Sequence, residues 1–335
     1  MRQILRLRVF SSLLTSTMRS HTYIDSLGSA SIMARVLDGK ALAMEIKNEL
    51  KEQIANWVQL GHRAPSIRCI LVGEDPASHT YVNNKINAAK YVGIDASVIR
   101  HDNTITEGEL IQEIETLNAD SNVDGILVQL PIPETMSERK VCNAVAPEKD
   151  VDGFHIVNVG QLCIDMPTIV PATALAVIEM LKRFNIDTFG RNAVVVGRSK
   201  NVGLPIAMML HSDKKHENGL GMDATVTICH RYTPKEKLDQ FCQNADIIIT
   251  ATGVPKLIKA NMIKPGATVI DVGITKITDS DGKSKLVGDV DYDEVIKIAG
   301  AVTPVPGGVG PMTVAMLMHN TFQAARQLRQ KSPLQ

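Results

Sequence analysis

A tyrosine and a lysine lie four residues apart in segment 77–93, which has the pattern of a helix ending at a glycine. Residues four apart share one face of a helix, so Tyr81 and Lys85 should point the same way. A lysine whose pKa is lowered by burial or by neighbouring groups can transfer protons near neutral pH. Lysine side chains are mostly solvated, so an ordinary surface position for Lys85 is the competing interpretation.

Two more polar residues lie in short motifs that could take part in binding or catalysis. Gln129 lies near the end of the apolar strand 125–131, shortly before two prolines, where it could position a neighbour or cap a turn. Asp152 lies in Lys-Asp-Val-Asp-Gly, which could bind a ligand but is also good turn chemistry. A Tyr-x-x-x-Lys pair is typical of short-chain dehydrogenases as well. Their glycine-rich turn precedes the pair, whereas here the candidate turn begins more than a hundred residues after it.

That candidate turn is the segment Val194–Pro205. It consists of a strand, Gly197, four polar or charged residues, Val202 and Gly203, and an apolar helix. Backbone N–H groups at such a helix N-terminus can bind phosphate. The G-x-G-x-x-G fingerprint is absent, because Ser199 stands where its second glycine would be. A plain strand-to-helix turn is the alternative interpretation.

Two series of alternating helices and strands position these residues. The first series has a helical face over 42–57, strands at 67–73, 96–101 and 125–131, and helices at 77–93 and near 106–117. The second has a helix near 172–184 and strands at 193–197, 224–229, 246–250 and 267–272. Continuously apolar strands of this kind form parallel sheets covered by helices. Ligands bind at the carboxyl edge of such sheets, where the strands 246–250 and 267–272 each lead into a glycine.

Composition excludes several classes of protein. The chain has 335 residues, of which 44% are hydrophobic, and its 36 Lys and Arg balance 36 Asp and Glu. No overall charge favours nucleic acid or a membrane surface, and no apolar run reaches the roughly 18 residues of a membrane span. The five cysteines are odd in number and widely spaced, which fits neither a disulfide framework nor a zinc site. We therefore expect a soluble protein of a reducing compartment, with no nucleic-acid or membrane partner.

The N-terminus differs from the rest of the chain. It carries Arg2, Arg6, Arg8 and Arg19, several hydroxyl residues and no acidic residue before Asp25. Arg-rich, Ser-rich and acid-poor segments are typical of organelle transit peptides, although a disordered tail could have the same composition. We predict that residues 1–34 direct the protein to the mitochondrial matrix.

Five motifs in order resemble the bifunctional methylenetetrahydrofolate dehydrogenase/cyclohydrolase family, and together they extend from about Val36 to the end of the chain. They are GEDPASHTYVNNK (73–85), VQLPIP (128–133), PEKDVDGF (147–154), VVVGRSKNVGLP (194–205) and TPVPGGVGPMT (303–313). The motif HRYTP (230–234), with the transit-like N-terminus, is similar to the mitochondrial NAD-dependent branch, since NADP-preferring relatives usually have serine where Arg231 stands. The resemblance implies a homodimer.

The fold implied is α/β with two domains: an N-terminal three-layer α/β domain and a Rossmann-like dinucleotide-binding domain, with a folate cleft between them. Residues 35–175 and 304–330 would form the catalytic folate-binding domain, and 176–303 the NAD-binding domain. The activity implied is oxidation of 5,10-methylenetetrahydrofolate by NAD, followed by hydrolysis of the methenyl product to 10-formyltetrahydrofolate.

The resemblance also implies roles for individual residues. Lys85 would move protons, Gln129 would position it, Tyr81 would stack on the folate, and Asp152 would pair with the pterin; the first three are the expected catalytic residues. The residues expected at the substrate are Tyr81, Val82, Asn83, Asn84, Lys85, Val128, Gln129, Leu130, Asp152, Pro306, Gly307, Gly308, Val309 and Gly310. Those expected at the cofactor are Gly197, Arg198, Ser199, Arg231, Thr252, Gly253, Ile274 and Thr313.

Two arginines near the expected adenosine ribose suggest a further ligand. NAD has no 2′-phosphate to meet Arg198 and Arg231, and guanidinium groups suit phosphate oxygens. We predict that inorganic phosphate binds there, with Asp223 holding a Mg²⁺ beside it, since Mg²⁺ prefers carboxylate and phosphate oxygens. The mitochondrial branch that the chain resembles is activated by both ions. Two surface arginines and a loop-capping Asp223 are the alternative.

Two other functions remain open from the sequence. A catalytically silent nucleotide- or folate-binding protein could have the same fold, although the presence of Tyr81, Lys85, Gln129 and Asp152 favours an enzyme. An amino-acid or shikimate-type dehydrogenase would share the two-domain plan, but it gives no reason for VQLPIP together with PGGVGPMT.

Overall fold

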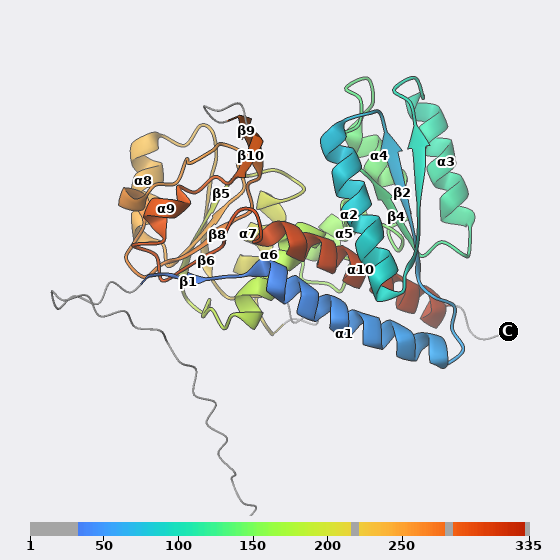
Figure 1. The fold of residues 1–335 in the computed structure, drawn as a ribbon, viewed down its shortest axis with the longest axis horizontal. Helices are drawn as coiled ribbons and strands as arrows, with labels where there is room; N and C mark the ends of the chain where they lie inside the picture. Colours follow the sequence, from blue (N-terminus) through green and yellow to red (C-terminus); the bar gives the residue numbers. More distant parts are fainter. Residues whose placement is uncertain (1–32, 216–220, 279–283, 332–335) are drawn as a thin grey trace, which may run out of the picture. The chain divides into compact units, whose positions relative to one another are not determined.

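The computed structural model describes residues 33–215, 221–278 and 284–331 (Figure 1). The predicted transit peptide lies almost wholly outside these residues. Within them, the chain folds into two parallel sheets with helices between and around the strands. No helix in this part of the chain is both long and apolar enough to cross a membrane. The α/β architecture predicted from the strand and helix patterns is confirmed.

The first sheet has three parallel strands in the order β3-β2-β4. Its elements are β2 (Ser66–Val72), β3 (Asp95–His101), β4 (Gly125–Val128), α2 (Pro76–Val92), α3 (Glu107–Ala119), α4 (Glu138–Ala144) and α5 (Ile156–Cys163). Alternate residues of β2 enter two different cores: Cys69 and Leu71 join the core with α2, whereas Ile70 and Val72 join the core with α3 and α4. The sheet is therefore covered on both faces.

The second sheet has six parallel strands, and it includes the start of the described chain. In spatial order they are β1 (Arg35–Val36), β11 (Ala301–Val302), β8 (Thr268–Asp271), β7 (Ile247–Thr250), β5 (Asn192–Val196) and β6 (Thr225–Cys229). The sequence did not indicate β1 or β11, because two residues cannot show a periodicity. The pairing of β1 with β11 places residues 35–36 in this sheet, whereas they were expected in the other domain.

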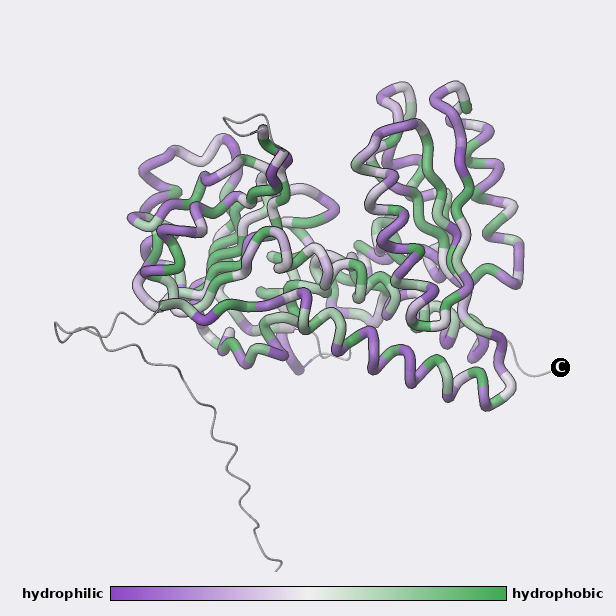
Figure 2. Tube along the Cα trace, in the orientation of Figure 1, coloured by the Kyte–Doolittle hydropathy of each residue, from purple (hydrophilic) through white to green (hydrophobic). Residues whose placement is uncertain are grey.

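The second sheet is also covered on both faces. Its helices and its antiparallel hairpin are α6 (Ala172–Arg183), α7 (Gly203–His211), α8 (Lys235–Asn244), η1 (Ala260–Met262), β9 (Thr275–Thr278), β10 (Ser284–Val287) and α9 (Tyr292–Val295). Along β5, Ala193 and Val195 pack with α6 and α7, and Val194 and Val196 pack with the core around Cys242 of α8. Figure 2 shows the hydrophobic residues concentrated along the strands of this sheet.

Two long helices connect the cores. They are α1 (Gly39–Gln59) and α10 (Val309–Lys331), and α10 packs against α1, α2, α6, β2 and β4. A buried carboxylate, Asp124, secures the end of α10: it accepts hydrogen bonds from Arg63 at 2.7 and 2.9 Å and from Arg329 at 2.9 Å. The last segment of the chain is therefore fixed to the first sheet.

The helix that carries the Tyr–Lys pair is defined at both ends by its sequence. Asp75 accepts a hydrogen bond from the Ser78 N–H at 2.8 Å, Pro76 occupies the first turn, and Gly93 ends α2 in a left-handed conformation with φ of +90°. The neighbouring strand β4 is shorter than predicted, ending at Val128 rather than at residue 131, because Pro131 has no N–H to continue the ladder.

Candidate active site

Lys85 is held by Gln129 rather than extending freely into solvent. The Lys85 Nζ donates to the Gln129 Oε1 at 2.9 Å, although the two residues are 44 positions apart. Gln129 follows β4, is only 8% exposed, and donates its Nε2 to the Leu130 carbonyl at 2.6 Å. Both ends of the glutamine amide are thus engaged, which fixes the position of the half-buried Lys85 amine. The predicted pairing of these residues is present.

Asp152 belongs to the same cluster of charge. Burial raises the pKa of its carboxyl to about 6, the positive charge of Lys85 opposes that rise, and the nearby Asp150 adds to it. Burial raises the pKa of the neighbouring Cys69 thiol to about 12, with smaller electrostatic effects from Lys85, which lowers this pKa, and from Asp152, which raises it. The ammonium, the amide and the carboxylate therefore form one partly buried polar group at the carboxyl edge of the first sheet.

A buried aspartate that the sequence reading missed holds the turn bearing Asp152. Asp150 accepts hydrogen bonds from the backbone N–H groups of Gly153 and His155 at 3.1 and 2.7 Å and from the Asn158 amide at 2.9 Å. Gly153 has φ of +72°, and a Cβ on it would lie 2.6 Å from the Pro171 nitrogen. The Lys-Asp-Val-Asp-Gly motif is thus a turn, as its composition indicated, and it also places a carboxylate near Lys85.

The other residues predicted at the substrate occupy different environments. Tyr81 is 44% exposed one turn before Lys85, and Asn83 and Asn84 are exposed on the same helix. Val82 and Val128 are buried within the hydrophobic cores. These two side chains serve packing, so any contact they make with a ligand must come from their backbone.

The glycine-rich segment 304–310 connects β11 to α10. Gly307 has φ of +108°, and its carbonyl accepts the Lys40 N–H at 2.8 Å. A Cβ on Gly39 would lie 2.0 Å from the Gly308 oxygen, so the start of α1 and this segment pack backbone to backbone. A Cβ on Gly310 would lie 3.3 Å from the side chain of Ile274, which brings the predicted substrate and cofactor segments together.

The loop after β5 uses its glycines for packing. Gly197 has φ of +129°, and a Cβ on it would lie 2.3 Å from the Ala251 carbonyl oxygen; a Cβ on Gly203 would lie 2.2 Å from the oxygen of Gly197. The Ser199 hydroxyl accepts the Gly203 N–H at 3.3 Å at the start of α7. The Ser199 hydroxyl therefore accepts one of the N–H groups at the start of α7 that would otherwise be free to donate to a phosphate.

Arg198 and Arg231 lie at the same edge of the second sheet. They follow β5 and β6, two parallel strands in which Asn192 is paired with Thr225 at one end and Val196 with Cys229 at the other. The Arg198 guanidinium carbon lies 5.9 Å from the centre of the Tyr232 ring, so the two loops are in contact. No carboxylate in the described part of the chain forms an ion pair with either arginine. The structure thus presents two uncompensated positive groups on neighbouring loops.

Asp223 lies at the opposite edge, before the amino end of β6, so the structure does not place it beside these arginines and its magnesium role stays a prediction. It precedes β6, its N–H donates to the Ser212 carbonyl, and its own carbonyl accepts from Gly190 before β5. The length of β6 separates it from Arg231, about 13 Å at 3.3 Å per residue. The alternative interpretation fits better, because the Asp223 carboxylate accepts the Lys214 N–H at 3.3 Å within its own loop. No trio of His, Cys, Asp or Glu in the described residues forms a ready metal site.

Thr252 and Ile274 follow β7 and β8 at the carboxyl edge of the second sheet. The Thr252 N–H and hydroxyl both donate to Asp289 Oδ2, at 2.6 and 2.8 Å. Thr313, on α10, donates to the Val309 carbonyl at 3.2 Å and to the Thr173 hydroxyl at 3.4 Å. Asp289 was not predicted. The sequence shows it only as an aspartate between a glycine and a valine, shortly before α9.

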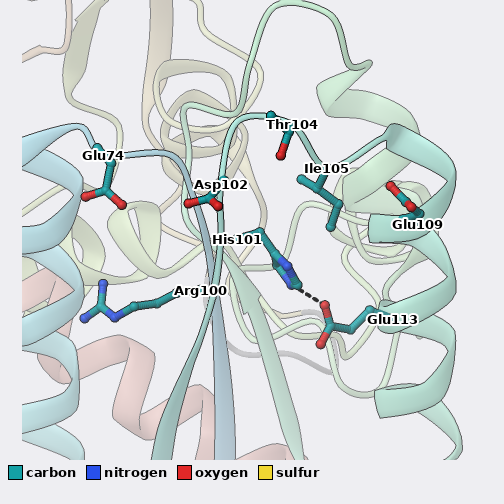
Figure 3. Close-up of a pocket in the computed structure, with 8 residues that line it drawn as sticks. All are labelled: Glu74, Arg100, His101, Asp102, Thr104, Ile105, Glu109 and Glu113. Carbon is teal, nitrogen blue, oxygen red and sulfur yellow. Dashed lines mark hydrogen bonds and ion pairs between the residues drawn. The ribbon is translucent and has the colours of Figure 1, made fainter.

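A separate hollow of about 530 Å³ lies between the carboxyl end of β3 and the first half of α3. It is lined by Glu74, Arg100, His101, Asp102, Thr104, Ile105, Glu109 and Glu113. Figure 3 shows His101 and Glu113 facing each other across it, with Arg100 directed away from that pair. It contains none of the predicted site residues, and its four carboxylates would repel an anionic ligand.

Comparison with known proteins gives two domain matches. Residues 37–152 match "Tetrahydrofolate dehydrogenase/cyclohydrolase, catalytic domain", and residues 171–329 match "Tetrahydrofolate dehydrogenase/cyclohydrolase, NAD(P)-binding domain". The second match extends through α10, although that helix packs against the first sheet. The two matches correspond to the two sheets described above.

Individual relatives are similar over most of the chain. The Homo sapiens "Bifunctional methylenetetrahydrofolate dehydrogenase/cyclohydrolase 2, mitochondrial" is 56% identical over 296 residues, which cover 88% of this chain and 85% of that one. A mitochondrial bifunctional relative from Drosophila melanogaster is 55% identical, covering 88% and 96%. A solved 5,10-methylenetetrahydrofolate dehydrogenase from the silkworm Bombyx mori is 74% identical with a TM-score of 0.85, covering 89% and 100%. The chain therefore belongs to the tetrahydrofolate dehydrogenase/cyclohydrolase family.

Proposed function

We propose that this protein oxidises 5,10-methylenetetrahydrofolate to the 5,10-methenyl form with NAD and hydrolyses that product to 10-formyltetrahydrofolate. The observation that carries the proposal is the Lys85–Gln129 hydrogen bond of 2.9 Å beside the raised-pKa carboxyl of Asp152. Family membership supplies the substrate class, and the cluster supplies groups suited to both a cationic intermediate and a proton transfer.

The dehydrogenase step depends on alignment. The methylene carbon lies between two nitrogens whose lone pairs stabilise the cation left when hydride departs, so no protein base is needed. The nicotinamide, when bound, accepts that hydride at its C4 position. The protein must hold the two reacting carbons together, with Asp152 on the pterin and Tyr81 against the folate. The contact between Ile274 and Gly310 supports a common site, since it joins the cofactor and substrate segments.

The hydrolytic step requires a proton to change places. Water adds to the methenyl carbon and loses one proton, which leaves a hydroxyl group on that carbon. The hydroxyl group then loses its proton to form the formyl C=O as the bond from the carbon to N5 breaks and N5 takes up a proton, so that one proton is released overall. In its uncharged form, the Lys85 amine would accept the first proton from water and deliver it to N5, which is general base and general acid catalysis by one group. Gln129 would keep the amine in position through both transfers, since its other end is fixed by the Leu130 carbonyl.

NAD rather than NADP is proposed as the cofactor, with inorganic phosphate as an accessory ion. Arg198 and Arg231 follow neighbouring strands and have no carboxylate partner among the described residues. A phosphate between them would offer bidentate contacts and would remove the repulsion of two guanidinium groups. Magnesium would bind that phosphate through the phosphate oxygens and waters, an arrangement that does not require Asp223.

The cofactor proposal is tested by steady-state kinetics of methylenetetrahydrofolate oxidation with NAD and with NADP, each titrated with phosphate and magnesium. Phosphate should lower the KM for NAD and should compete with NADP, whose 2′-phosphate would take the same position. Arg231→Ser should lose both responses. The control is Arg191→Ser, an exposed arginine paired with Asp187 at the other edge of the sheet, which should retain both. NAD turnover indifferent to phosphate would contradict the accessory-ion proposal.

The same assay tests the activity itself. A protein that binds folate and dinucleotide without turnover would be the silent binding protein considered above. Pyruvate, glutamate and shikimate serve as control substrates for the other dehydrogenases of similar plan.

The mitochondrial matrix and a homodimer complete the proposal. Relatives from Homo sapiens and Drosophila melanogaster are named mitochondrial, and residues 1–34 have the composition of a transit peptide. A fluorescent protein fused after residue 34 should enter the matrix, and a cytosolic signal would contradict that targeting. Sedimentation of the purified enzyme should give twice the chain mass of 36.5 kDa, less any cleaved transit peptide, and a monomer would contradict the dimer.

A further inference from the structure

Two buried acidic residues lie at the carboxyl edge of the second sheet, and none of the proposed chemistry uses them. Asp271 is the last residue of β8, and Asp289 follows the hairpin strand β10; they are 3% and 0% exposed. No lysine, arginine or histidine in the described residues forms an ion pair with either carboxyl group. Buried acids without a cationic partner are costly, so their contacts require an explanation.

Asp289 organises the loop that follows β7. Its Oδ2 accepts the Thr252 N–H at 2.6 Å and the Thr252 hydroxyl at 2.8 Å. The same hydroxyl accepts the Val254 N–H at 3.1 Å, and the Gly253 carbonyl accepts from the Thr275 hydroxyl at 3.1 Å. The conformation of the loop therefore depends on one carboxylate oxygen that lies 37 residues away in the chain.

Asp271 holds the backbone around Asp289 and the loop that follows β8. Its Oδ1 accepts the N–H groups of Gly273 and Asp289 at 3.0 and 3.1 Å, and its Oδ2 accepts the Val290 N–H at 2.9 Å. A Cβ on Gly273 would lie 2.2 Å from Asp289 Oδ1, so the glycine lets the second loop pass directly over the carboxylate. One acidic centre thus fixes both loops predicted at the cofactor.

A further feature separates Asp289 from an ordinary structural anchor. Its Oδ1 has no hydrogen-bond partner among the described residues, although the residue is fully buried. Burying an unpaired acceptor lowers stability, and an alanine or a serine would avoid that cost if only packing were needed. The carboxylate at this position is therefore explained by the hydrogen bonds that it accepts from Thr252 in the loop after β7.

We propose that Asp289 is a positioning residue for the dehydrogenase reaction: it holds the Thr252–Val254 loop in the conformation that binds the dinucleotide. The inference rests on the proposed function and adds to it the residue that shapes the cofactor side of the site. It also predicts a division of effects, because hydrolysis of the methenyl substrate uses no dinucleotide and should not depend on this loop.

The test measures NAD affinity by calorimetry, dehydrogenase KM and kcat, and cyclohydrolase rate without nucleotide, on the full chain. Asp289→Ala should weaken NAD binding about tenfold or more, because a charge-assisted hydrogen bond to the loop backbone is lost. Asp289→Asn should recover most of that affinity, since its amide oxygen can still accept the Thr252 N–H. Cyclohydrolase activity should stay within about twofold of wild type in both variants.

The control is Thr188→Val, which removes an equally buried hydrogen bond, 2.7 Å to the Met222 carbonyl, at the other edge of the same sheet. It should lower the melting temperature without changing NAD affinity. An Asp289→Ala variant with wild-type NAD affinity, or with equal losses of both activities, would overturn the inference. If that variant does not fold, Asp289→Ser decides, because a serine is too short to reach the Thr252 N–H: weaker NAD binding with intact hydrolysis supports the inference, and unchanged binding overturns it.

Failure of the proposed function looks different. In that case the wild-type chain itself would neither bind NAD nor oxidise methylenetetrahydrofolate, whereas failure of the Asp289 inference leaves the wild type active and the variants like it.

Discussion

Replacing Lys85 by methionine removes the amine while keeping a side chain of similar length. If this amine moves the protons of hydrolysis, the cyclohydrolase rate should fall by about 10²–10⁴-fold, the usual contribution of a general acid or base. Hydride transfer depends on alignment and should fall less. The ratio of the two activities, rather than either alone, is therefore the quantity to measure.

The structure also sets the effect of this change on stability. Gln129 Oε1 would lose the donor now 2.9 Å away, in a residue only 8% exposed. An unpaired buried acceptor costs about 1–3 kcal/mol, less than the roughly 5–15 kcal/mol that holds a domain folded. The variant should fold with a lowered melting temperature. Without the positive charge, burial of Asp152 is less opposed, and its pKa should rise further above about 6.

Both activities can be followed by absorbance, the dehydrogenase by the reduced nicotinamide and the cyclohydrolase by loss of the methenyl substrate. Lys90→Met is the matched control, an exposed lysine in the last turn of the same helix, and both of its rates should stay near wild type. Equal losses of the two activities in Lys85→Met, with folate affinity unchanged, would refute the division of labour.

Three further changes test the site and its support. Asp124→Ala should lower the free energy of unfolding in urea by about 3–5 kcal/mol, because Arg63 and Arg329 both lose their buried carboxylate partner. The control Asp95→Ala removes an exposed carboxylate from its ion pair and should lower the free energy of unfolding by less than about 1 kcal/mol. Gly39→Ala should raise the folate KM and lower both activities, since its Cβ would lie 2.0 Å from a backbone oxygen of the glycine-rich segment; Gly108→Ala, with open space around it, should not. Asp152→Asn should flatten the pH dependence of unfolding. Burial raises this pKa from 3.8 to about 6, so the contribution of Asp152 to the free energy of unfolding is full below about pH 4 and is lost as the pH rises through about 6. The free energy of unfolding in urea should therefore fall more between pH 4.5 and pH 7.5 in the wild type than in the variant, and an equal change in the two proteins would contradict this.

Periodicity and end signals were sufficient to predict most of the elements that carry the site. The pattern over 77–93 predicts a helix, and α2 spans Pro76–Val92 because an aspartate, a proline and a glycine define its ends. The buried strands are visible because they are apolar at every position, as expected when both faces of a sheet are covered. The hairpin of β9 and β10 and the two-residue strands carry too little pattern to predict.

Placement across a sheet was less predictable than placement along the chain. Asp223 and Arg231 are only eight residues apart, and both flank the same strand, so the sequence could not separate a shared site from opposite edges. The parallel register decides the question, because it places whatever precedes β6 at the amino edge. Asp289 was missed for the converse reason: its partner Thr252 lies 37 residues away, and nothing near Asp289 indicates that distant contact.

The glycine-rich segment explains why two activities can share one site while depending on different residues. Its β11 end belongs to the second sheet, its α10 end packs on the first, and Lys40 at the start of α1 bonds to its middle at Gly307. Lys85 and Asp289 are each fixed within one sheet, so changes there should act on one activity. A change in this segment, or in the Gly39 that packs against it, moves the connection between the sheets, and both activities should fall together.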